Sequence, residues 1–105
     1  MTTFDKREQG FESKFVHDEE LRFKATARRN RLLGMWAAAK LGLAGEAASA
    51  YANYLVDFGL EESGAEATLH MVSKDLASKG ISEQEIALRM DELFRAAVEQ
   101  IQAGK

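Results

Sequence analysis

A series of apolar residues near the C-terminal end, repeated at helical spacing, constrains the fold of this chain more than any other feature. The series falls at i, i+4, i+7, i+8, i+11 and i+15, positions occupied by Ile86, Met90, Leu93, Phe94, Ala97 and Ile101. At about 100° per residue, this spacing places the six side chains along one side of an α-helix. Such a side must be covered, so the sequence predicts an amphipathic helix packed against other helices.

Signals for three more helices stand earlier in the sequence. Residues 63–66 and 82–85 both have the Ser-x-x-Glu form of a capping box, which opens a helix. Gly42, Gly59 and Gly80 stand where a glycine can end the preceding helix in the left-handed conformation. We therefore expect helices over residues 18–41, 46–58, 63–79 and from residue 82 onward. Their short connections favour antiparallel neighbours, and the predicted fold class is all-α, a four-helix bundle.

Composition agrees with a helical, globular protein. The chain has 105 residues and no proline, with 46% hydrophobic and 30% charged residues, which is typical of one folded domain. It has no cysteine, hence no disulfide framework or thiolate metal site, and this fits a reducing compartment. The N-terminus has no apolar signal core, and no apolar run approaches the length of a membrane span. We expect a cytoplasmic protein that does not insert into the membrane.

Charge is distributed unevenly along the chain. The net charge is −3, but residues 1–20 carry three basic and six acidic groups, residues 21–40 six basic groups and no acidic one, and residues 41–105 five basic and eleven acidic groups. Most of the basic residues of the middle stretch fall close together, at Arg22, Lys24, Arg28, Arg29 and Arg31. A positive helix beside a negative remainder can be neutralised internally, or it can bind an acidic partner.

Residues 1–17 lack the core-facing pattern of the rest of the chain. Phe4, Phe11 and Phe15 fall at i, i+7 and i+11, within about 40° of one another on a helix. Gly10 costs a helix about 1 kcal/mol relative to alanine, so this segment alone would form a marginal helix. The phenylalanines can fold back and cap the core, or the segment can be a flexible N-terminal arm that becomes helical in a partner's groove. In either case we predict that residues 18–105 form the bundle.

The sequence offers little material for catalysis or metal binding. Its two histidines, His17 and His70, are far apart in the chain, whereas a metal site needs several ligands that converge. His17 and the acidic residues 18–20 fan around a helix start, and capping and surface charge explain them better. No Gly-rich phosphate loop or nucleophile elbow is present. We predict no enzymatic activity, no cofactor and no bound metal.

Nucleic-acid binding is the alternative function that the sequence raises. The basic residues from Arg22 to Arg31 could neutralise phosphates from one helix. Basic groups are scarce elsewhere, however, and the net charge is negative. The apolar Leu32 and Leu33 that follow would also turn the helix into the core and limit its access to a groove. We therefore expect that nucleic acid is not the partner.

Three stretches carry a resemblance to a known family. They read REQGFESKF, HDEELRF and ARRNRLLGMWAA, and they lie between Arg7 and Ala38. In these three stretches the chain resembles the zeta subunit of alphaproteobacteria, an inhibitor of the F1Fo-type ATP synthase. The resemblance implies a bundle of four helices with a mobile N-terminal arm that blocks ATP hydrolysis. It also implies a protein that is monomeric when free and peripheral at the inner membrane when bound to the synthase.

The same resemblance implies roles for individual residues of the arm. A zeta-type arm inserts as a helix at a catalytic α/β interface of the F1 sector, near the γ subunit, and stops rotation in the hydrolytic direction. In this chain Phe4, Phe11 and Phe15 would fill apolar slots at that interface. The charged residues of the arm would pair with interface charges, and they are Lys6, Arg7, Glu8, Glu12 and Lys14.

Overall fold

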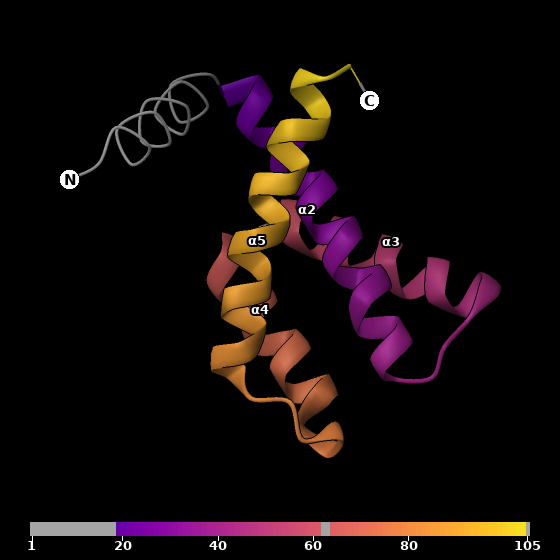
Figure 1. Ribbon diagram of the computed structural model, residues 1–105. Helices are drawn as coiled ribbons and strands as arrows, with labels where there is room; N and C mark the ends of the chain where they lie inside the picture. Colours follow the sequence, from indigo (N-terminus) through magenta and orange to yellow (C-terminus); the bar gives the residue numbers. More distant parts are fainter. Residues whose placement is uncertain (1–18, 62–63, 105) are drawn as a thin grey trace.

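The computed structural model describes residues 19–61 and 64–104. Within these residues the order of elements is α2 (Glu19–Lys40), α3 (Gly45–Glu61), α4 (Gly64–Leu76), the 3-10 turn η1 (Ala77–Lys79) and α5 (Glu83–Gln102). Helices α2 and α3 form one hairpin, and α4 and α5 form a second hairpin that packs against the first (Figure 1). The predicted all-α fold with four helices is confirmed.

Several helix ends are explained by local interactions that the sequence predicted, namely capping side chains and left-handed glycines. Glu19 and Glu20 lie in the first turn of α2, where carboxylates meet unpaired N–H groups and the positive end of the macrodipole. The Oγ of Ser82 accepts a hydrogen bond of 3.1 Å from the backbone N–H of Glu85, which confirms the N-cap predicted for α5. Gly42 has a φ of +80° just after α2, so it ends this helix as expected. The predicted cap at Ser63 lies outside the described residues.

Two predicted helix ends need correction. Gly59 was expected to end the second helix, but α3 continues through it to Glu61. Gly59 has a packing role instead of a stop role, because a Cβ at residue 59 would overlap the Nδ2 atom of Asn30 on α2. The third helix was expected to reach residue 79, but α4 ends at Leu76 and the chain continues as η1 before the left-handed Gly80.

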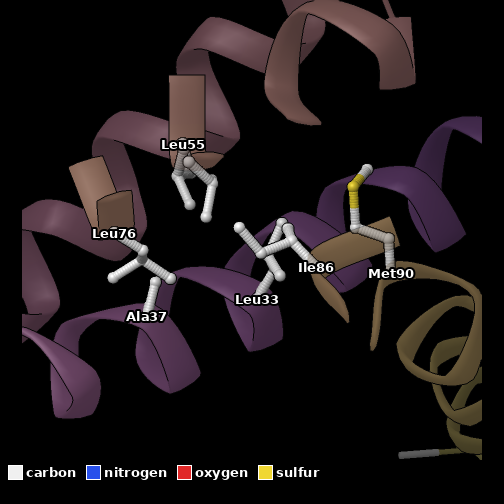
Figure 2. Close-up of a cluster of buried hydrophobic side chains, with 7 residues drawn as sticks. Leu33, Ala37, Leu55, Leu76, Ile86 and Met90 are labelled. Carbon is white, nitrogen blue, oxygen red and sulfur yellow. The ribbon is translucent and has the colours of Figure 1, made fainter. Parts of the chain in front are cut away.

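The main core lies between the two hairpins, and Figure 2 shows most of its side chains pointing toward one another. Its fully or nearly fully buried members are Leu33 and Ala37 from α2, Leu55 from α3, Val72 and Leu76 from α4, and Ile86 and Met90 from α5. A second cluster joins Ala25 of α2 to Val98 of α5, with Phe94 and Ile101 packed against it. The N-terminal half of α2 therefore lies beside the C-terminal half of α5. The apolar side predicted for α5 is confirmed by these contacts.

Small residues allow α2 and α3 to approach closely. A Cβ added at Gly34 would lie 2.5 Å from the Cα of Ala52 and 3.0 Å from its Cβ, and ordinary carbon contacts are about 3.5–4.0 Å. Ala37, Ala38 and Ala52 are buried along the same seam. This seam and the main core cover much of the apolar second half of α2. Met35, with 42% of its surface exposed, marks the side that stays open.

Trp36 lies at the edge of the core rather than inside it. Its ring packs against the main cluster while remaining partly exposed. Two cations lie over the ring, with Lys40 Nζ 5.6 Å and Arg89 Cζ 5.3 Å from the centroid, distances at which the ring face attracts a cation. Trp36 therefore links α2 to α5 through both apolar packing and cation–π contacts.

Candidate functional site

The basic residues of α2 do not all lie on one face of the molecule. The side chain of Arg29 points inward and is only 8% exposed. Four others border two neighbouring hollows on the surface, and they are Arg22, Lys24, Arg28 and Arg31. The structure thus brings together four of the five predicted partner-binding residues and separates the fifth.

The larger hollow is a groove of about 510 Å³ between α2, α3 and α5. We call it the basic groove, and its lining residues are Phe23, Lys24, Ala27, Arg28 and Arg31 of α2, Asn53 and Val56 of α3, and Ile101 of α5. A smaller hollow of about 290 Å³ adjoins it and is lined by Glu19, Arg22, Phe23, Thr26 and Gly59. Phe23 lines both hollows and is 57% exposed. The site therefore combines an exposed aromatic ring with cationic side chains.

Hydrogen bonds and an ion pair restrain the rim of the basic groove. Lys24 Nζ lies 3.3 Å from Glu20 Oε1 in an i,i+4 pair, with the glutamate on the N-terminal side, which is the more favourable order in a helix. Arg31 Nη1 donates a 3.0 Å hydrogen bond to Asn53 Oδ1 on α3. Both contacts are exposed, and exposed contacts of this kind contribute little to stability. They hold Lys24 and Arg31 at the rim of the groove, where both side chains stay exposed.

Arg29 takes part in a buried polar contact beneath this surface. Its Nε and Nη2 atoms donate to Asn30 Oδ1 at 3.1 and 2.9 Å. Burial lowers the pKa of the Arg29 guanidinium, and the negative charge of Asp91 on α5 acts in the opposite direction. Asn30 is fully buried, and its Nδ2 atom has no hydrogen-bond partner among the described residues. Arg29 and Asn30 thus belong to the interior, and their role is in packing α2 against the other helices.

Neither Phe23 nor Asn30 stood out in the sequence as a site residue. Phe23 reads as one more apolar position of an amphipathic helix, and its exposure depends on where α3 and α5 lie. The importance of Asn30 could have been suspected only from Gly59, a glycine inside a helix that leaves room for the amide. The exposure of Phe23 and the burial of Asn30 both depend on tertiary contacts, which helical periodicity does not predict.

The predicted arm lies outside the described residues. This holds for Phe4, Lys6, Arg7, Glu8, Phe11, Glu12, Lys14 and Phe15, and also for His17 and the predicted boundary after residue 17. His70 is exposed on α4, with Nδ1 3.2 Å from Glu83 Oε2. Over residues 19–61 and 64–104, no group of three or more His, Cys, Asp or Glu side chains could hold a metal ion. None of the helices in these ranges has the length and hydropathy needed to cross a membrane.

Comparisons with known proteins identify the family. No curated protein matches the chain. A protein whose structure was solved by solution NMR is similar, with 38% sequence identity and a TM-score of 0.71 over 81% of this chain and 99% of that chain. The family model described as ATPase inhibitor subunit zeta matches residues 1–100. The chain therefore belongs to the ATPase inhibitor subunit zeta family, whose members regulate an ATPase and are not enzymes.

Proposed function

We propose that this protein inhibits ATP hydrolysis by inserting residues 3–18 as a helix at a catalytic α/β interface of the F1 sector, near the γ subunit. The observation that carries the proposal is the extent of the family match. It begins at residue 1 and so includes the segment with the three phenylalanines as well as the helical body. A wedge at that interface would stop rotation in the hydrolytic direction.

The spacing of the arm residues supports an insertion of this kind. Phe4, Phe11 and Phe15 would share one side of a helix and fill apolar slots in the interface. Lys6, Arg7, Glu8, Glu12 and Lys14 would flank that side and pair with charges of F1. The arm holds three acidic and three basic residues over positions 1–17, so it can complement a surface that carries both positive and negative charges.

Magnitudes indicate that the arm needs an anchor. Burial of three phenylalanines contributes about 5–9 kcal/mol, whereas ordering about twelve residues costs about 12–24 kcal/mol of backbone entropy. Helical hydrogen bonds and charge contacts must supply part of the difference. A body that binds F1 nearby would supply more, because it raises the local concentration of the arm. The folded helices α2 to α5 are suited to this role.

The proposal also fixes where the protein acts. The free protein would be a monomer in the cytoplasm that needs no cofactor. When bound to the synthase it would lie at the periphery of the inner membrane.

Removal of residues 1–17 tests the proposal. Purified F1 is assayed for ATP hydrolysis with the full-length protein and with the truncated protein, and the helical melting transition of each is recorded. We expect inhibition to be lost while the melting temperature stays the same. Equal inhibition by both proteins would overturn the proposal.

A further inference from the structure

Phe23 occupies an unusual position for a large aromatic side chain. It is 57% exposed and stands between the basic groove and the smaller hollow. The floor of the basic groove beside it is apolar and comes from three helices, with Ala27, Val56 and Ile101 among its lining residues. An apolar side chain of a partner could therefore enter the groove and contact the Phe23 ring, as anchors do in many interfaces.

The charged side chains that line the basic groove are all basic. Lys24, Arg28 and Arg31 line the basic groove, and no acidic side chain of the described residues is among its lining residues. The smaller hollow beside it is lined by one cation and one anion, Arg22 and Glu19. The chain as a whole has a net charge of −3, so the charge of the basic groove is opposite in sign to the net charge of the protein. Its charge complement is an acidic surface, and guanidinium groups suit carboxylates in particular.

The basic groove lies along the N-terminal half of α2, and the smaller hollow beside it reaches the first residue of that helix. Glu19 is the first residue of α2 and lines the smaller hollow. Residues 1–18 precede it directly, and a helix of eighteen residues spans only about 27 Å. An arm inserted into a partner must therefore bring this end of α2 close to the same partner. Surfaces near the C-terminal end of α4 and the N-terminal end of α5 would lie farther from this partner.

From these three observations we infer that the basic groove is the surface by which the helical body docks on F1. Its occupant is an acidic protein surface that presents an apolar side chain to Phe23, between Ala27, Val56 and Ile101. The inference rests on the proposed function and adds the docking face and the chemistry of its partner. Docking here supplies the anchor that insertion of the arm requires, because binding of the body converts insertion into an intramolecular step.

Full-length variants test the docking face while leaving the arm intact. Phe23→Ala removes the aromatic ring, and Lys24→Glu combined with Arg31→Glu reverses the charge of the rim. The matched controls are Leu88→Ala, at an apolar residue with 62% exposure near the other end of α5, and Lys74→Glu, at an exposed cation on α4. Thermal melting of each variant verifies that it folds.

The measured quantities are the Kd for purified F1 and the residual ATP hydrolysis at saturating protein. We expect both groove variants to bind about tenfold or more weakly, which is the effect of removing a central anchor, and both controls to bind like wild type. At saturation, the groove variants should still inhibit. Charge reversal should also remove most of the salt dependence of binding, since the rim charges act through electrostatic attraction.

A third variant separates failure of the docking inference from failure of the proposed function. The full-length protein with Phe4, Phe11 and Phe15 replaced by alanine should bind F1 through the groove without inhibiting it. Full inhibition by this variant would overturn the proposed function. Wild-type affinity of the two groove variants would overturn the docking inference alone.

Two other occupants of the groove give distinct results. Tighter binding of Phe23→Ala to F1 would show that the groove holds the protein's own N-terminal segment, and this would overturn the inference. Loss of affinity for DNA or RNA in the groove variants, with unchanged affinity for F1, would assign the groove to nucleic acid and would overturn it as well.

Discussion

Substitution of Gly34 by alanine tests the packing of α2 against α3. In a helix exposed to solvent, this change would stabilise the protein by about 1 kcal/mol, because alanine has the higher helix propensity. Gly34 is buried, however, and an added Cβ would lie 2.5 Å from the backbone Cα of Ala52. It would also lie 3.3 Å from Leu55 Cδ1. The nearest atom belongs to the backbone, so a side-chain rotation cannot relieve the overlap and α3 must move.

The size of the effect follows from two opposed contributions. Restoring an ordinary contact of about 3.5 Å requires α3 to shift by about 1 Å, and overpacking of this kind costs about 1–3 kcal/mol, occasionally more. Because the contact is with backbone on a seam of small residues, we take the upper part of this range and subtract the gain in helix propensity. The expected net destabilisation is about 2 kcal/mol, which lowers Tm by about 8–16 °C for a domain of this size.

Urea denaturation and thermal melting, both followed by circular dichroism, measure this change. Ala39→Gly serves as the control, since residue 39 is exposed on the same helix and reports the propensity contribution without a packing contribution. The control should cost about 1 kcal/mol. A Gly34→Ala protein that is as stable as wild type, or more stable, would refute the reasoning about close approach.

Three other substitutions have expected outcomes. Gly59→Ala should destabilise by about 1–3 kcal/mol, because the added Cβ overlaps Asn30 Nδ2. Ser82→Ala should cost about 1 kcal/mol through loss of the N-cap of α5. Burial and the 2.8 Å hydrogen bond to Asp75 raise the pKa of Tyr51. Stability from this group is present below pH about 10, the unfolded pKa, and declines above it. Tyr51→Phe, about 1 kcal/mol less stable at neutral pH, should therefore approach wild type as the pH rises above 10.

Urea denaturation checks all three outcomes. Gly59→Ala would contradict the account if it gained the stability that helix propensity alone predicts. Ser82→Ala would contradict it by melting like wild type. For Tyr51→Phe, the decisive result is the difference in the free energy of unfolding from wild type. A difference that is constant or grows above pH 10 would contradict the assigned effect of burial and of Asp75.

Local signals in the sequence were sufficient to predict the helices. The apolar series that ends at Ile101 predicted the buried side of α5, and its members are buried or partly buried in the structure. Ser82 predicted the start of the same helix, because an N-cap depends only on neighbouring residues. Gly42 predicted the end of α2 for the same reason. Helical periodicity and capping depend only on residues that are close in the sequence, so both can be recognised without knowing the tertiary structure.

Contacts between helices were not accessible in this way. Gly59 looks like a stop signal in the sequence, but the amide of Asn30 occupies the space that its side chain would need. The basic residues of α2 look like one cluster, but burial separates Arg29 from the others. The exposure of Phe23 depends in turn on where α3 and α5 lie. Each outcome depends on which helix packs on which face, and that information is distributed over the whole chain.

The central claim is that a helical body holds the protein on F1 while its N-terminal residues enter the enzyme. Hydrogen exchange of the full-length protein, free and bound to inhibited F1, measures this directly. We predict that the amides of residues 1–17 become strongly protected on binding, while those of α4 keep the exchange rates of the free protein. Unchanged exchange over residues 1–17 in a complex that is bound and inhibited would contradict the claim.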